Sequence, residues 1–199
     1  MKLVRRGFLI GLVGAALATS GPAFGLSIDQ AKAHVQKTID DLLVLLRQSS
    51  NGKSRAPALQ KIMESRANVP LWARFSAGRA WREMDKSQQN EFVGAFSQYL
   101  AVTYARRFDE YAGDPKVTIG NAIDAGKKGI VVPSPIQMGT NEPVAIEWLV
   151  SDRGGRIEVV DLIIEGISLA ATQREEINAM LDKRGGDVDV LIADLRTAQ

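Results

Sequence analysis

Two carboxylates, Asp161 and Glu165, lie four residues apart in the apolar stretch VVDLIIEGISL, which covers residues 159–169. Two carboxylates on one face could in principle work as a pair on one bond. On a strand, however, side chains four residues apart share one face at a separation of about 13 Å. This separation is long for two acids that act on one bond. We therefore interpret both as solvent-facing or hydrogen-bonded structural acids.

Other signatures of catalysis are absent from the sequence. The one histidine, His34, lies in a predicted helix without a second ligand at the spacing of a His-Glu-x-x-His site, so a solvated or helix-flanking role fits it best. The sequence has no nucleophile elbow, phosphate-binding loop or dinucleotide fingerprint, and no cysteine for thiolate chemistry. We expect no catalytic residue, no metal site and no cofactor, so that an enzyme would need unconventional catalytic groups.

The start of the chain has the features of an export signal. A basic beginning, an apolar run over residues 8–18 and a small-residue end predict a signal peptide over residues 1–25. The apolar run is too short for a bilayer, which needs about 20 apolar residues. The segment RRGFL also resembles a twin-arginine signal, although an ordinary two-arginine start fits as well. We expect one periplasmic domain over residues 26–199.

The charge of the expected mature chain argues against a nucleic-acid partner. The full chain carries 25 basic and 23 acidic residues, and removal of Lys2, Arg5 and Arg6 leaves 22 basic residues. The mature chain is then slightly acidic, so the electrostatic footprint of a nucleic-acid-binding protein is missing.

Helical periodicity dominates the first half of the domain. Apolar residues recur at three- and four-residue spacing over residues 28–46, which predicts an amphipathic helix that Asn51-Gly52 ends. Further helices are expected over residues 57–66 and 70–84. A capping box of Asp85 and Gln88 predicts a long helix to about residue 111, and Thr172 with Glu175 predicts another box near the C-terminus. A last helix is expected to start at Asp187.

Four apolar segments with turn sequences between them predict the sheet. They cover residues 116–123, 129–138, 143–150 and 156–169. Such short connections favour antiparallel hairpins, because a parallel crossover needs a dozen residues or more. Pro133 and Pro135 lack amide protons on the same edge, so the second strand is expected to be bulged or exposed there. The elements together predict an α+β domain with a four-stranded antiparallel meander sheet wrapped by about six helices.

Large apolar side chains gather on elements that should face each other. The predicted helix over residues 86–111 carries an aromatic stripe, and the strands add apolar residues at plausible inward positions. A filled core and a lined pocket use the same residue types, so periodicity alone leaves both open.

A family resemblance favours the pocket. The array AGRAWR over residues 77–82, QQNEF over 88–92 followed by Phe96, Leu100 and Tyr104, and DLIIEGISL over 161–169 followed by Arg174 resemble the MlaC, or toluene-tolerance, family. The resemblance implies a periplasmic phospholipid-binding protein of a retrograde lipid transport system, and a branch linked with hopanoid lipids is an alternative.

The resemblance implies a carrier that encloses acyl chains in an apolar cavity and shuttles lipid between the outer and inner membranes. The implied partners are a phospholipid ligand, an inner-membrane ABC transporter complex and an outer-membrane lipoprotein complex, through transient membrane-protein contact. A hopanoid or other hydrophobic-ligand carrier, or a periplasmic protein-binding adaptor, is the alternative. The side chains that we expect to contact the tails are Phe92, Phe96, Tyr99, Ile130, Val132, Val144, Ile146, Trp148, Ile164 and Ile167. Within this scheme Gly166 should bend the last strand at the sheet edge, and Asp161 should anchor turns or a nearby arginine.

Overall fold

The computed structural model describes residues 25–48, 51–108, 115–137 and 142–197. The predicted signal peptide, apart from Gly25, lies outside these residues, and so does the predicted end of the long helix near residue 111. The signal peptide and its export route therefore stay predictions.

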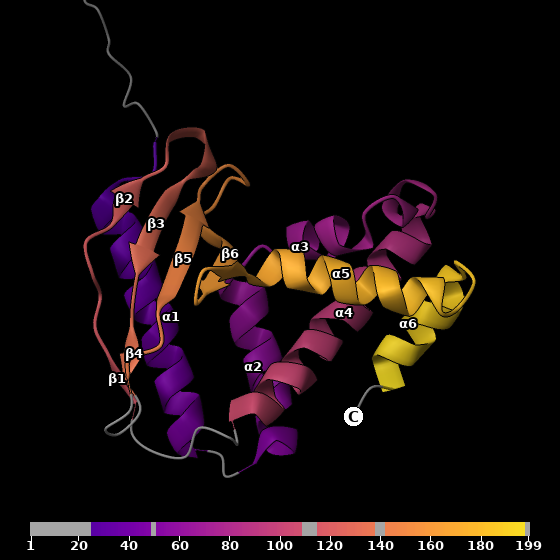
Figure 1. The fold of residues 1–199 in the computed structure, drawn as a ribbon, viewed down its shortest axis with the longest axis horizontal. Coiled ribbons are helices and arrows are strands. Elements are labelled where there is room, and N and C mark those ends of the chain that lie inside the picture. Colours follow the sequence, from indigo (N-terminus) through magenta and orange to yellow (C-terminus); the bar gives the residue numbers. More distant parts are fainter. Residues whose placement is uncertain (1–24, 49–50, 109–114, 138–141, 198–199) are drawn as a thin grey trace, which may run out of the picture.

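The fold is α+β, as expected, with six α-helices in the described residues (Figure 1). They are α1 (Ile28–Gln48), α2 (Gly52–Arg66), α3 (Val69–Ala77), α4 (Lys86–Arg107), α5 (Leu169–Asp182) and α6 (Val188–Thr197). Within the described ranges, the short 3-10 helices η1 (Ala80–Arg82) and η3 (Gly126–Lys128) connect other elements. In the part of the chain with described coordinates, we find no helix with the length and apolar character that a membrane span requires.

The sheet is an antiparallel meander with more strands than the sequence predicts. Five strands pair in the order β2 (Ile123–Asp124), β3 (Ile130–Pro133), β5 (Ile146–Ser151), β6 (Glu158–Ile164) and β7 (Ile167–Ser168). A separate two-stranded sheet joins β1 (Lys116–Val117) to β4 (Ile136–Gln137). The prediction of four strands is therefore wrong in number, although the antiparallel neighbour order is correct.

Two prolines explain why the first two predicted strands each divide. The backbone amides of Thr118 and Gly120 donate to the carbonyls of Pro135 and Pro133 at 3.4 and 2.8 Å. The prolines have no amide proton to donate in return, so a regular ladder cannot form across them. The first segment thus separates into β1 and β2, and the second into β3 and β4.

The fourth predicted segment divides at a tight turn. Glu165 and Gly166 have φ values of 50° and 78° and connect Ile164 to Ile167, which pair across β6 and β7. Positive φ at both central residues is the signature of a type I′ hairpin turn. Gly166 thus bends the chain into the edge strand β7, as expected.

Asp161 is an anchor for the start of α5. One carboxylate oxygen accepts a hydrogen bond from the Ser168 hydroxyl at 2.6 Å, and the other accepts from the Ala170 amide at 3.1 Å. Ser168 in turn caps α5 by accepting from the Ala171 amide at 3.1 Å. The capping box predicted at Thr172 is therefore wrong, because the hairpin brings Ser168 into place and the helix starts earlier.

Two helix boundaries also differ from the prediction, whereas a third agrees with it. Asn51 begins α2 instead of ending α1, since its side chain accepts from the Ser54 amide at 2.9 Å. Helix α3 ends at Ala77 because Gly78 takes φ 58°, a left-handed conformation that interrupts the helix. The capping box of Asp85 and Gln88 is present as predicted.

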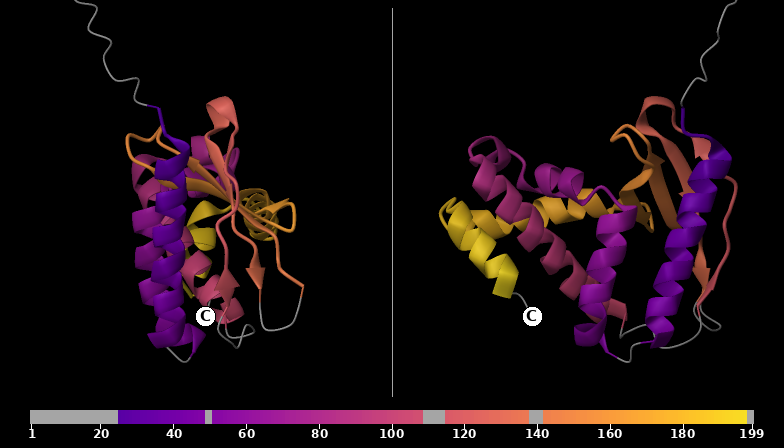
Figure 2. Two further views of the ribbon diagram at one scale, coloured as in Figure 1. Left: turned by 90° about the vertical axis from the view of Figure 1, so that its left-hand side faces the viewer. Right: turned by 180° about the vertical axis from the view of Figure 1, so that it is seen from behind.

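The helices do not wrap the sheet evenly. Helix α1 runs along the sheet and contacts β3 and β5, while α3 and α5 meet β6 (Figure 2). Helices α2, α4 and α6 pack successively on one another, and α3 packs on α5, so most of the helical layer extends away from the sheet (Figure 1). This arrangement brings α1, α2 and the C-terminal half of α4 around one side of β5 and β6.

Candidate ligand cavity

An apolar cavity of about 340 Å³ lies among these elements. Pockets for small molecules commonly measure about 300–1,000 Å³. Most of its walls come from α1, α2, the end of α4, β5 and β6. The lining residues are Thr38, Ile39, Leu42, Leu43, Leu46, Leu59, Ile62, Met63, Arg66, Ala67, Trp72, Leu100, Tyr104, Arg107, Phe108, Pro115, Val117, Ile136, Val144, Ile146, Trp148, Val159, Leu162, Ile164 and Leu169.

The indole N–H groups of the two tryptophans in the wall form hydrogen bonds within the protein. The Trp72 indole nitrogen donates to the Val160 carbonyl at 2.7 Å, and the Trp148 indole nitrogen donates to the Ser134 hydroxyl at 2.6 Å. Ser134 is fully buried between the two prolines of the divided strand. Because both N–H groups have partners in the protein, neither needs a polar ligand atom.

Two more polar side chains of the wall have partners in the protein. The Thr38 hydroxyl donates to the His34 carbonyl at 2.8 Å. The Arg66 guanidinium donates to one carboxylate oxygen of Asp41 from two nitrogens, at 3.0 and 2.7 Å. His34 Nε2 lies 2.8 Å from the Arg66 carbonyl oxygen, so His34 connects α1 to the end of α2, consistent with its predicted helix-flanking role.

The end of α4 supplies the remaining polar groups. The Tyr104 hydroxyl accepts a hydrogen bond from Gln173 at 3.3 Å, and the Arg107 guanidinium lies 5.1 Å from the centre of the Tyr104 ring. Burial raises the pKa of Tyr104, although the nearby Arg107 charge acts in the opposite direction. Arg107 is exposed, whereas every other lining residue is buried or half-buried, so Arg107 marks the rim of the cavity.

Behind this wall lies a small polar network. The Tyr99 hydroxyl donates to one Glu176 carboxylate oxygen at 2.5 Å, and Gln173 donates to the other at 3.1 Å. Burial, followed by the hydrogen bond to Glu176, raises the pKa of Tyr99. The network fixes α5 against α4 on the side away from the cavity lining.

In the described ranges, no cluster of His, Cys, Asp or Glu is suited to hold a metal ion. An apolar cavity whose polar groups are mostly satisfied by the protein suits an apolar ligand.

The structure brings four of the ten expected ligand contacts to the cavity: Val144, Ile146, Trp148 and Ile164. Five others lie in the core, outside the lining: Phe92, Phe96, Tyr99, Ile130 and Val132. Ile167 is 65% exposed on the edge strand. Contact with a ligand stays a prediction for all ten.

The aromatic stripe of α4 serves two environments in turn. Near its start, Phe92 stacks on Phe96 at 5.8 Å and meets the edge of Trp81 at 6.5 Å. Farther along, Leu100, Tyr104 and other residues line the cavity. The stripe thus passes from the packed core to the cavity wall about midway along the helix, a change that its sequence period does not show.

Sequence reasoning missed the helical half of the cavity wall. Leucines of α1 and apolar residues of α2 form much of it, namely Leu42, Leu43, Leu46, Leu59, Ile62 and Met63. A signal was present, since Leu42, Leu43, Leu45 and Leu46 cover more of the helix surface than one narrow stripe requires.

Comparison with known proteins places this chain in a family. Residues 36–197 match the family described as MlaC protein. The chain belongs to the MlaC family. Among solved structures, the phospholipid-binding protein from Ralstonia solanacearum, solved in complex with a phospholipid, superposes with a TM-score of 0.70. The match covers 84% of this MlaC-family chain and 96% of the other, at 24% identity, which establishes a shared fold.

Proposed function

We propose that this MlaC-family protein is a periplasmic carrier that encloses phospholipid acyl chains and moves the lipid between the outer and inner membranes. The observation that carries the proposal is the apolar cavity between α1, α2, α4 and the sheet. The phospholipid bound to the Ralstonia solanacearum protein of the same fold supports it.

The physical need for such a carrier comes from the lipid itself. Two acyl chains with roughly 30 methylenes, at about 0.8 kcal/mol each, oppose transfer into water by more than about 20 kcal/mol. A protein lowers this barrier only where apolar side chains replace the water around the tails. The cavity wall offers such side chains from both helices and strands.

The resemblance implies partners at both membranes: an inner-membrane ABC transporter complex and an outer-membrane lipoprotein complex. Lipid would enter from one and leave to the other. The carrier itself performs no chemical reaction in this scheme, and the lipid should therefore be recovered unchanged.

Native mass spectrometry after mild purification tests the proposal. We expect a mass shift equal to an intact phospholipid, confirmed by extraction and product analysis. An empty protein that captures a polypeptide would instead support a protein-binding adaptor. A cleaved or isomerised lipid would support an enzyme.

A further inference from the structure

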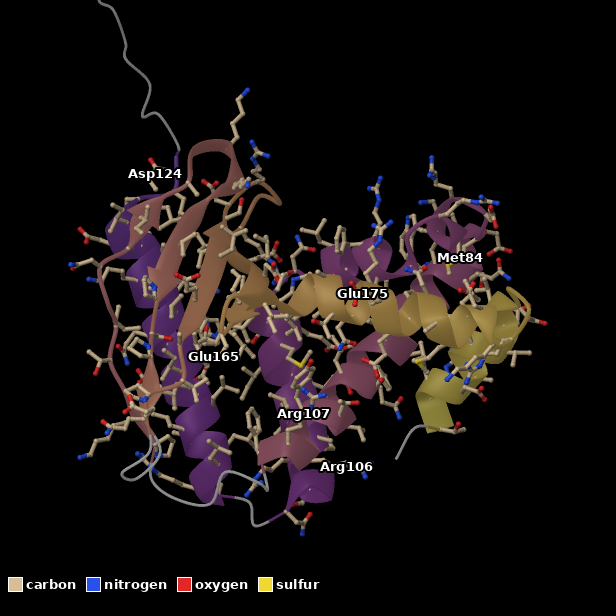
Figure 3. The ribbon with its side chains drawn as sticks, viewed as in Figure 1. Met84, Arg106, Arg107, Asp124, Glu165 and Glu175 are labelled. Carbon is tan, nitrogen blue, oxygen red and sulfur yellow. The ribbon has the colours of Figure 1, made fainter. Side chains whose placement is uncertain are left out.

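Arg107 lies on the cavity wall, and the binding of apolar acyl chains does not explain a charged residue there. It is an exposed residue in an otherwise buried or half-buried lining, on the last turn of α4. Figure 3 labels it beside the end of α4, together with its neighbour Arg106. An arginine at the rim places a permanent positive charge where the cavity meets water.

The charge of Arg107 is not neutralised by the described part of the protein. Arg66, the other arginine of the wall, forms an ion pair with Asp41 at 2.7 Å. Among the described residues, no carboxylate forms an ion pair with Arg107, and its guanidinium lies over the face of the Tyr104 ring. A guanidinium stacked on an aromatic face keeps its N–H edge available to another acceptor.

The ring that carries Arg107 is itself held in place. Gln173, which is 2% exposed, donates to the Tyr104 hydroxyl and also to Glu176. Glu176 accepts from Tyr99, one turn earlier on α4. The network on α5 thus fixes Tyr104 from behind, and Tyr104 orients the guanidinium at the rim.

We propose that Arg107 binds the phosphate oxyanion of the lipid head group at the cavity mouth, with Tyr104 as its positioning residue. Guanidinium and phosphate match in charge and in their paired hydrogen-bond geometry. This inference rests on the proposed function and makes it more specific, because a hopanoid or other neutral lipid without phosphate gains nothing from this group. The carrier is then selective for phosphate-bearing lipids over neutral lipids with the same tails.

Competitive uptake from mixed vesicles tests the proposal. Delipidated protein is incubated with vesicles of phosphatidylglycerol and diacylglycerol that have identical acyl chains, and the lipids bound after re-isolation are quantified by mass spectrometry. We expect wild type to enrich phosphatidylglycerol. Arg107→Gln should lower that enrichment about tenfold, since charge-assisted hydrogen bonds are the strong ones and this site is open to water. Arg107→Lys should keep part of it.

Arg106→Gln is the matched control, because it removes the same charge from the adjacent residue, which does not line the cavity. It should enrich phosphatidylglycerol as wild type does. Equal losses in both glutamine variants would mean general attraction to the anionic vesicle and would overturn the proposal. Unchanged enrichment in Arg107→Gln, or a parallel loss of both lipids, would overturn it as well.

Two further measurements are needed. One distinguishes a lipid head group from free phosphate as the ligand of Arg107, and the other distinguishes failure of the head-group site from failure of the carrier function. Millimolar inorganic phosphate should leave uptake unchanged, whereas loss of enrichment in its presence would assign Arg107 to free phosphate and overturn a head-group site. If wild type takes up neither lipid, the carrier function fails, and the head-group site fails with it. Uptake without dependence on Arg107 rejects the head-group site alone.

Discussion

At the scale of single residues, the cavity wall separates polar atoms from apolar surface within one side chain. Trp148 presents its ring to the cavity while its N–H donates to the buried Ser134, and Trp72 does the same with a backbone carbonyl. Each indole therefore gives a large apolar area without an unsatisfied donor. Such residues make the wall suited to acyl chains.

Filling the cavity should block the ligand without unfolding the protein. Ile146 is half-buried on β5 and lines the cavity, so Ile146→Phe directs added volume into empty space. We expect the amount of bound phospholipid to fall strongly. Overpacking a filled core usually costs about 1–3 kcal/mol, and the loss in unfolding free energy should be smaller here because the added volume enters a cavity. Native mass spectrometry and urea unfolding measure the two effects.

The matched control is Phe96→Leu, which alters a fully buried ring outside the lining. It should lower the unfolding free energy and leave the lipid content unchanged. If Phe96→Leu loses lipid while Ile146→Phe retains it, the tails occupy a different part of the protein.

The tyrosines on α4 should make stability sensitive to alkaline pH. Burial raises the pKa of both Tyr99 and Tyr104, and ionised Tyr99 would face the Glu176 carboxylate. A group whose pKa rises on folding contributes stability below its unfolded pKa, about 10 for tyrosine, and this contribution is lost as the pH rises further. Wild type should therefore lose stability above about pH 10.

Tyr99→Phe isolates the effect. It should be less stable than wild type at neutral pH, because it loses the bond to Glu176, but should lose less stability on further alkalisation. The urea midpoints of both proteins, measured at neutral pH and above about pH 10, give the difference. Parallel curves for the two proteins would mean that Tyr99 ionisation is not coupled to unfolding.

At the scale of elements, one hairpin organises the junction between the sheet and α5. The turn at Glu165 and Gly166 creates β7 and presents Ser168 to Asp161, which also accepts from the first turn of α5. The Glu165 amide donates to the Ala145 carbonyl at 2.9 Å, and its side chain accepts from the Ala145 amide, so the turn is also tied to the start of β5. The two acids that were considered for catalysis thus have structural roles.

Gly166→Val should destabilise the protein through the backbone alone. Gly166 has φ 78° and no atom within 4 Å of the position of an added Cβ, so the cost is conformational strain and not a clash. We expect a loss of about 1–3 kcal/mol in unfolding free energy and a lower folded yield. Asn at this position should cost less, since Asn tolerates left-handed φ better.

Gly94→Ala provides the comparison for this variant. Gly94 also has open space around it, but lies inside α4 without a positive φ, so Ala should be neutral or add about 0.5–1 kcal/mol. Thermal denaturation measures both variants. A fully stable Gly166→Val would refute the role assigned to this turn.

At the scale of the whole molecule, several helices extend away from the sheet and α1 (Figure 1). The cavity lies at the junction, with lining residues from both parts. An empty apolar cavity leaves its walls with fewer contacts than a filled core provides. A bound ligand should supply the missing contacts and therefore stabilise the folded protein.

Removal of lipid should lower the melting temperature. A ligand that binds only the folded protein stabilises it by about 2.7 kcal/mol at a free concentration one hundred times its Kd. Differential scanning calorimetry before and after delipidation measures the change, and added phospholipid should restore the original value. Glycerol 3-phosphate, which has no tails, should have no such effect; equal restoration by both would argue against binding through the cavity.

Local chemistry is the part of this protein that could be predicted from the sequence. The apolar period of residues 28–46, the capping box of Asp85 and Gln88, and the short turns between strands depend on neighbours in the chain, and each predicts an element that is present. The motif DLIIEGISL was part of the resemblance to the MlaC family, and the family match over residues 36–197 confirms that resemblance.

Tertiary structure decided which apolar residues face a cavity. Phe96 and Tyr104 belong to one stripe of α4, yet Phe96 lies in the core and Tyr104 in the wall, because the elements opposite each differ. The split strands likewise required two prolines to meet the amides of a neighbouring segment. Burial and void depend on long-range packing, whereas a residue's type and period describe only its own element, so the cavity with Arg107 at its rim emerges only in the folded protein.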